Sequence, residues 1–363
     1  MSDPFAFLVA RGPIADATTA TAWLDAMLQV EAALALSQAA VGDIPADAAN
    51  TIAKACRVDE FDVAAIFEGA ALGGNPVIPL VDRLRKVVPP SAAKFVHHGA
   101  TSQDIMDTAA MLVVRHCCRI AFDQLDAAAE RVGYLEDRHG DFPMIGRTLG
   151  QYAEETTFAN VTERWWTGIR EGGAVLRELY IMLPLQLGGP VGDAATFGAH
   201  ADAIAGDVAY RLGLIAPARS WHTERAPIAR IASAWGLTAS AVSTVATQIV
   251  MLAASDVGEL GEQADGAGGS SSMPHKHNPV AAISARAAAM QVPGQVATLL
   301  HAAGGHEFER AAGSWHAEWP ALNDLLRATG SAIDWLVTSL QRLTVDADRM
   351  AANLARAESE RTP

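Results

Sequence analysis

The chain has 363 residues, 50% of them hydrophobic, and a formal net charge of −14. Its length and apolar content allow a large buried core and exclude a wholly disordered chain, while the negative charge, with no basic patch, argues against nucleic acid or a membrane surface as a partner. The three cysteines show no metal-ligand spacing and residues 1–11 show no secretory pattern, so we expect a reduced, cytoplasmic protein without a metal.

The first part of the chain predicts short helices. Apolar residues three and four apart indicate a helix over Thr18–Val41, which Gly42 ends, and Pro45 suits the first turn of a second helix. Prolines then divide the sequence into short helices and turns; they are Pro76, Pro79, Pro89 and Pro90. We therefore expect a small helical N-terminal domain over residues 1–96.

Long helices dominate the rest of the sequence, and strand signals are almost absent, so the predicted fold class is all-α. Helical spacing covers Gln103–His139, about Gly150–Leu179, Arg225–Gln263, and a late helix from Leu322 to Leu343. We expect a central long-helix bundle over residues 97–345 and a short C-terminal remnant over 346–363. Helices with small residues all round need partners on several sides, which predicts a homo-oligomer.

One stretch, Ile231–Ser255, is uncharged and long enough to span a bilayer. It also carries several small polar side chains, which would lack partners in lipid but are tolerated in a helix packed on other helices; they are Ser233, Ser240, Ser243, Thr244, Thr247 and Gln248. We therefore interpret this stretch as a buried helix of a protein outside the membrane.

The segment from Gly268 to Pro279, GGSSSMPHKHNP, carries the strongest chemical signal. Its glycines allow movement, its serines offer hydroxyl groups, and Lys276 with two histidines supplies positive charge for an anionic ligand. A flexible surface linker is the alternative that composition alone leaves open. The segment resembles the third shared region of the fumarase/aspartase superfamily, GSSxMPxKxN, at every fixed position.

That resemblance implies roles for the loop residues. Ser270 would be the base that removes a proton α to a carboxylate, and Lys276 and Asn278 would hold that carboxylate. Ser271 and His275 belong to the same predicted substrate-binding loop.

A second stretch, His97 to Asp104, resembles the superfamily's first region, HxGxTSxD. The resemblance makes His97 a catalytic candidate and Thr101 and Ser102 ligands of a substrate carboxylate. Ser102 is also a natural N-cap for the helix that follows, and capping alone would explain both Ser102 and Asp104.

A third stretch, Gly146 to Gln151, resembles the second region, commonly GRTHxQ, and makes Thr148 and Gln151 substrate-binding candidates. An Arg-Thr pair near a helix start is ordinarily structural. The position of the family's acid/base histidine is Leu149. A leaving amine or hydroxide needs a proton, whereas a carboxylate with a solution pKa of about 4 leaves as an anion, so Leu149 favours a carboxylate leaving group.

Finer resemblances point to the superfamily's bacterial 3-carboxy-cis,cis-muconate cycloisomerases. They lie at Gly74–Leu80, Trp221–Arg225 and His306–Trp319, and they add Arg225 and Arg310 as substrate-binding candidates. Without the resemblance, the tryptophans would be core residues and the two arginines could as well lie at the surface. Longer relatives continue into a third helical domain, and its shortening here leaves open how the site is covered.

We expect a cofactor-free enzyme that interconverts 3-carboxy-cis,cis-muconate, a small polycarboxylate, and a carboxymuconolactone in protocatechuate catabolism. The resemblance further implies a homotetramer whose sites are shared between chains. Two alternatives remain. An adenylosuccinate lyase or related amino-releasing lyase would share the loop, but Leu149 and the short C-terminus count against it. A catalytically silent structural homologue would fit the lost histidine but not the intact loop.

Overall fold

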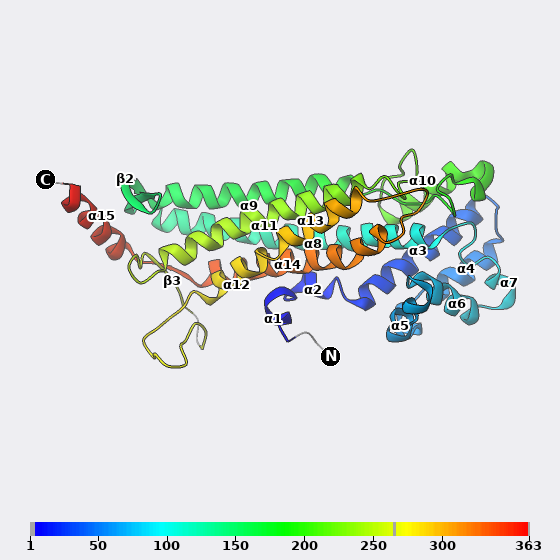
Figure 1. The fold of residues 1–363 in the computed structure, drawn as a ribbon, viewed down its shortest axis with the longest axis horizontal. Coiled ribbons are helices and arrows are strands. Elements are labelled where there is room, and N and C mark those ends of the chain that lie inside the picture. The colour runs from blue at the N-terminus through cyan, green and yellow to red at the C-terminus, as the bar shows by residue number, and fades with distance from the viewer. Residues whose placement is uncertain (1–3, 264–265, 362–363) are drawn as a thin grey trace.

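The computed structural model describes residues 4–263 and 266–361 and shows an elongated bundle of long helices (Figure 1). Its principal members lie side by side; they are α8 (Ser102–His139), α9 (Phe158–Ile181), α11 (Ala226–Leu252) and α14 (Ser314–Arg342). Two shorter helices, α12 (Val280–Ala289) and α13 (Val292–Ala303), pack on α11 and α14. The predicted all-α class is confirmed, with two small antiparallel strand pairs added.

The first part of the chain forms mostly short helices; those within residues 46–93 gather at one end of the bundle, whereas the first two lie along its side against α14 (Figure 1). The elements of this part are α1 (Ala6–Val9), α2 (Pro13–Asp16), α3 (Ala20–Ala40), α4 (Ala46–Ala55), the 3-10 turn η1 (Val58–Glu60), α5 (Val63–Gly73), α6 (Val77–Val87) and α7 (Pro90–Ala93). Helix α3 packs against α4 and also against α8 of the bundle. A domain boundary at residue 96 stays a prediction, because α3 and α8 share one core across it.

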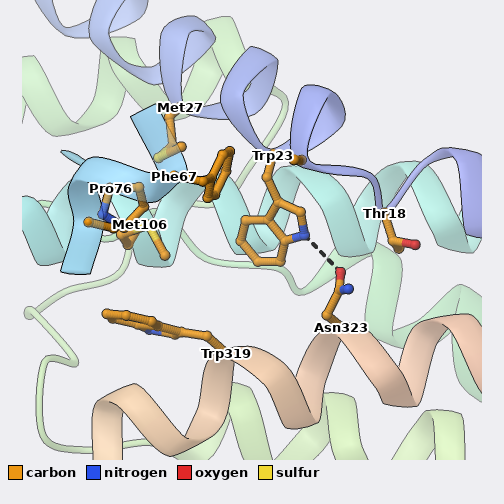
Figure 2. Close-up of a pocket in the computed structure, with 10 residues that line it drawn as sticks. Thr18, Trp23, Met27, Phe67, Pro76, Met106, Trp319 and Asn323 are labelled. Carbon is orange, nitrogen blue, oxygen red and sulfur yellow. Dashed lines mark hydrogen bonds between the residues drawn. The ribbon is translucent and has the colours of Figure 1, made fainter. Parts of the chain in front are cut away.

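A hydrogen bond links α3 to α14, and an apolar cavity lies between the two helices (Figure 2). The indole Nε1 of Trp23 donates to Oδ1 of Asn323 at 2.9 Å. The cavity has a volume of about 340 Å³, and Met27, Phe67 and Trp319 are among its lining residues. The N-terminal helices are therefore fastened to the same end of the bundle at which α8 begins.

Helix α8 sets the length of the molecule. Its N-cap is Thr101, whose backbone N–H donates to Oδ2 of Asp104 at 3.0 Å, and Gly140 follows its last residue. The expectation that Ser102 is the N-cap was wrong by one residue, because Ser102 already has helical geometry. At 1.5 Å per residue, the 38 residues of α8 extend about 57 Å.

An antiparallel hairpin follows α8, where a helix from Gly150 was expected. Strands β1 (Pro143–Thr148) and β2 (Gln151–Thr157) pair through the two turn residues Leu149 and Gly150, which have φ of 52° and 79°. Positive φ at both central residues is the geometry that closes a two-residue hairpin. The helical prediction was therefore wrong over Gln151–Thr157, and α9 begins only at Phe158.

Helix α11 is shorter than expected and ends at Leu252. The chain then turns, with Gly258 at a φ of 65°, and β3 (Leu260–Glu262) pairs with β4 (Leu343–Val345). The predicted helix to Gln263 was wrong. The backbone N–H of Glu259 donates to the carbonyl of Leu252 at 2.9 Å in a turn, and the buried Glu259 carboxylate is held by Arg147 and Asn353 from other elements.

Among the described residues, α11 is the one helix long and apolar enough to cross a membrane. It packs against α9, α12, α13 and α14. Its polar side chains find partners there: Thr238 Oγ1 donates to the carbonyl of Gly172 at 3.0 Å, and Gln248 Oε1 accepts from Nε1 of Trp165 at 2.7 Å. These contacts are those of a bundle helix, as expected. The remaining elements are η2 (Ala195–His200), α10 (Ala201–Leu212) and α15 (Ala347–Arg361).

Candidate active site

The first predicted site region lies where the N-terminal helices meet the start of α8. His97, in a left-handed conformation with φ of 60°, places Nδ1 2.6 Å from Oε1 of the buried Glu31 of α3. Burial works to lower the pKa of His97, but the charge and hydrogen bond of Glu31, with Asp104 nearby, outweigh it and raise that pKa above 6.5. The contact with Glu31 therefore favours the protonated form of His97.

The buried Asp104 holds several chain segments together at this end of the molecule. Its fully buried carboxylate accepts hydrogen bonds from the backbone N–H groups of Gly188 and Gly189, at 2.7 and 2.9 Å, and lies 2.9 Å from Nε2 of His222. It thereby ties the Gly-rich turn after α9 to the beginning of α8. Asp104 has no free oxygen for a substrate, so its role is to position the neighbouring region.

Arg310 joins the same cluster from the segment before α14. Its Nη2 donates to Oγ1 of Thr101 at 2.9 Å, and its Nε donates to Oε1 of Gln103 at 3.2 Å. A partly buried guanidinium therefore stands beside two of the predicted carboxylate ligands, Thr101 and Ser102. The structure brings Arg310 and the first region together, although their positions in the sequence are far apart.

Arg225 was expected to bind substrate, and the structure corrects this. Its guanidinium is fully buried and donates to Asp107 and Glu318, with a closest distance to Asp107 of 2.6 Å. Burial works to lower the pKa of Arg225, but these two carboxylates raise it overall. Arg225 therefore serves an internal ion network, in which His306 Nε2 also lies 3.1 Å from Glu318.

The second predicted region forms the tip of the β1–β2 hairpin. Thr148, Leu149 and Gln151 are all exposed there, and the side chain of Leu149 is fully so. Behind the tip, Arg147 makes a bidentate contact with the buried Glu259, at 2.7 and 3.1 Å. The hairpin therefore exposes the apolar Leu149 at its tip, while the contact between Arg147 and Glu259 holds the strand behind the tip.

The third region, residues 268–279, lies in a loop that extends away from the bundle (Figure 1). Ser271, His275 and Lys276 are exposed on it, so the loop carries its positive charge into solvent. The Oγ of Ser270 accepts the backbone N–H groups of Ser272 and Met273, at 3.3 and 3.2 Å. Two amide dipoles that point at one hydroxyl oxygen stabilise negative charge on it.

Hydrogen bonds link the two ends of the loop to each other and hold the helix that follows it. Asn278 donates its backbone N–H and its side-chain Nδ2 to the carbonyl of Gly268, at 2.8 and 3.0 Å. Before the loop, Glu262 accepts the first amides of α12, those of Ala281 and Ala282, at 2.9 and 2.8 Å. Asn278 thus has a structural function beside its expected contact with substrate.

The three regions do not meet within one chain. The first lies at the start of α8, whereas the hairpin and the loop lie at the opposite end of the bundle (Figure 1). The length of α8, about 57 Å by its helical rise, separates His97 from Thr148. A site built from all three regions therefore requires more than one copy of the chain.

Sequence reasoning missed the carboxylates that hold these regions: Glu31 under His97, Glu259 under the hairpin, and Glu262 under the loop. The signal that could have found Glu31 is its spacing, because it lies four residues after Met27 and three before Leu34, on the buried apolar face of α3. Among the described residues, no group of three or more His, Cys, Asp or Glu side chains is placed to hold a metal ion.

Comparison with known proteins agrees with this geometry. A family model described as a lyase matches residues 6–294. The chain belongs to this lyase family. It is 41% identical over 354 residues to a nitrosuccinate lyase of Streptomyces davaonensis, with 94% of this chain and 74% of the relative covered. It is also 41% identical to a 3-carboxy-cis,cis-muconate cycloisomerase of Bradyrhizobium diazoefficiens, with 91% and 74% covered.

Solved structures of this lyase family show the same fold. The 3-carboxy-cis,cis-muconate lactonizing enzyme of Pseudomonas putida superposes with a TM-score of 0.91 at 34% identity, covering 97% of this chain and 79% of that one. A fumarate lyase from Mesorhizobium gives 0.85 at 28% identity, covering 94% and 77%. The expected membership of the fumarase/aspartase superfamily is thus confirmed, and the chain is an enzyme of the lyase or isomerase type.

Proposed function

We propose that this enzyme interconverts 3-carboxy-cis,cis-muconate and a carboxymuconolactone by proton transfer at the carbon α to a carboxylate. The observation that carries the proposal is the pair of backbone amides on the Ser270 oxygen, in a loop that also bears Lys276. The 41% identity with a cycloisomerase supports the choice of substrate.

In the lactone-opening direction, the deprotonated Ser270 oxygen takes the proton from carbon and becomes a neutral hydroxyl, and the substrate becomes an aci-carboxylate. Lys276 and Asn278 stabilise the added charge on that carboxylate. The C–O bond of the lactone then breaks, and the ring oxygen leaves as part of a carboxylate anion. In the reverse direction, a substrate carboxylate attacks the diene and Ser270 returns the proton to carbon.

Leu149 fits this leaving group. The residue at this hairpin position cannot donate a proton, and a carboxylate with a pKa of about 4 does not need one. An apolar side chain at this position also keeps water away from the Ser270 oxygen in a closed site, because it binds no water molecules itself.

Because the three regions lie apart in one chain, we propose that each site is assembled from several copies, as in a homotetramer. The test is complementation between two inactive variants, Ser270→Ala on the loop and Ser102→Ala at the start of α8. When the two are unfolded and refolded together, shared sites containing neither change recover part of the activity. If every site belonged to one chain, the mixture would stay as inactive as its parts.

A second candidate is elimination from nitrosuccinate, supported by the 41% identity with the Streptomyces davaonensis enzyme. It obeys the same logic at Leu149, because nitrite departs as an anion without a proton. One preparation should be assayed for loss of the diene absorbance of 3-carboxymuconate, for nitrite release from nitrosuccinate, and for cleavage of adenylosuccinate. The first activity alone supports our proposal; nitrite release alone, or adenylosuccinate cleavage, contradicts it.

A further inference from the structure

A cavity of about 280 Å³ opens between α6 and the segment that precedes α8. Apolar side chains of α6 form one part of its lining, and the polar part consists of Asp82, Arg85, His97 and Ser102. Two of these residues belong to the predicted first region, whereas nothing in the sequence pointed to Arg85.

The charges around this cavity leave one cation without a counter-ion. His97 is matched by Glu31 at 2.6 Å, and Asp82 is matched by Nζ of Lys86 at 2.6 Å. In the part of the chain that the structure describes, no carboxylate forms an ion pair with Arg85. In a protein with a net charge of −14, an unmatched guanidinium in a cavity is the feature expected of an anion site.

Arg85 is also held in place over the site. Its Nη2 donates to the backbone carbonyl of Val96 at 3.3 Å, next to His97. One hydrogen bond leaves the other donors of the guanidinium fork free to bind a carboxylate. The Ser102 hydroxyl lies at the start of the long helix α8, where the helix dipole adds positive charge.

We propose that this cavity binds the carboxylate that distinguishes a tricarboxylate from a dicarboxylate, and that Arg85 is the residue that makes this selection. The inference rests on the proposed function only for its substrate class. The two sites bind different carboxylates of the substrate. The Ser270 loop of a second copy binds one, and Arg85 with Ser102 binds another.

Calorimetric titration with unreactive acids tests the proposal without turnover. The probes are propane-1,2,3-tricarboxylate and the dicarboxylate glutarate, and the variants are Arg85→Gln and the control Arg83→Gln. Arg83 is exposed on the same helix but lies outside the cavity lining. Loss of a charge-assisted contact should weaken tricarboxylate binding about tenfold in Arg85→Gln, with glutarate and the Arg83 variant within about twofold.

Unchanged tricarboxylate binding in Arg85→Gln would overturn the proposal, and so would an equal loss for both acids, which marks a general charge effect. Failure of the wild-type protein to bind the tricarboxylate would overturn it too. Turnover of 3-carboxymuconate is measured separately on the same samples. Selective binding without that turnover would refute the proposed function and keep the Arg85 assignment. Turnover with unselective binding would keep the proposed function and refute the Arg85 assignment.

Discussion

Replacement of Glu262 by alanine should weaken both the fold and the active-site loop. The carboxylate caps α12 by accepting from Ala281 and Ala282, and it also accepts from Oγ of the buried Ser339 at 2.6 Å. Loss of a helix cap costs about 1 kcal/mol, and an unsatisfied buried hydroxyl costs about 1–3 kcal/mol. We therefore expect the free energy of unfolding to fall by about 3 kcal/mol in urea titrations followed by circular dichroism.

The same variant should lose activity beyond its loss of stability, because Glu262 holds the first turn of α12, which follows directly after the Ser270 loop. A loosened anchor displaces the base, and a small misplacement lowers kcat about tenfold or more under conditions in which the protein stays folded. The matched control is Glu224→Ala, which removes a single exposed 3.3 Å contact at the start of α11. A Glu262 variant no less stable than the Glu224 variant would refute the reasoning.

Three further changes have defined outcomes. Glu31→Gln removes the partner of His97. The pKa of His97 is higher in the folded protein than its unfolded value of 6.5. The pair therefore contributes its whole stabilisation below pH 6.5 and loses it as the pH rises through the folded pKa. The gap in urea midpoint between wild type and this variant should therefore be larger at about pH 6 than at about pH 9, and a gap that widens with pH would contradict it. Arg147→Ala leaves the buried Glu259 carboxylate with one partner fewer and should cost about 3–5 kcal/mol by urea unfolding, against no clear change for the exposed Arg138→Ala. Leu149→Asn should leave the unfolding free energy within about 0.5 kcal/mol, since the side chain is fully exposed in one chain, while lowering kcat for 3-carboxymuconate; an unchanged kcat would show that the hairpin tip lies outside the site.

The sequence predicted the features that depend on local physics. The start and end of α8 follow from a capping segment and Gly140, and the bundle follows from long apolar periodicity. The three motif regions could be recognised from their residues. Their separation along α8 could not be read from the motifs, because it depends on where the two ends of a 38-residue helix lie.

The errors arose where distant partners override local preference. Gln151–Thr157 was given to a helix, but pairing with β1 holds it as a strand. The segment after α11 turns instead of continuing the helix, and its Glu259 side chain binds Arg147 and Asn353 from other parts of the chain. Arg225 has the same character as Arg310 in the sequence, and only the fold shows that it is buried between Asp107 and Glu318.

The most direct measurement compares turnover of 3-carboxymuconate by two loop variants, Ser270→Ala and Ser272→Ala, both with unchanged circular dichroism. Both changes leave the backbone amides in place, but only the first removes the oxygen to which two of them donate. We predict no detectable turnover for the first variant and near wild-type turnover for the second. Full activity of Ser270→Ala would show that another group moves the proton.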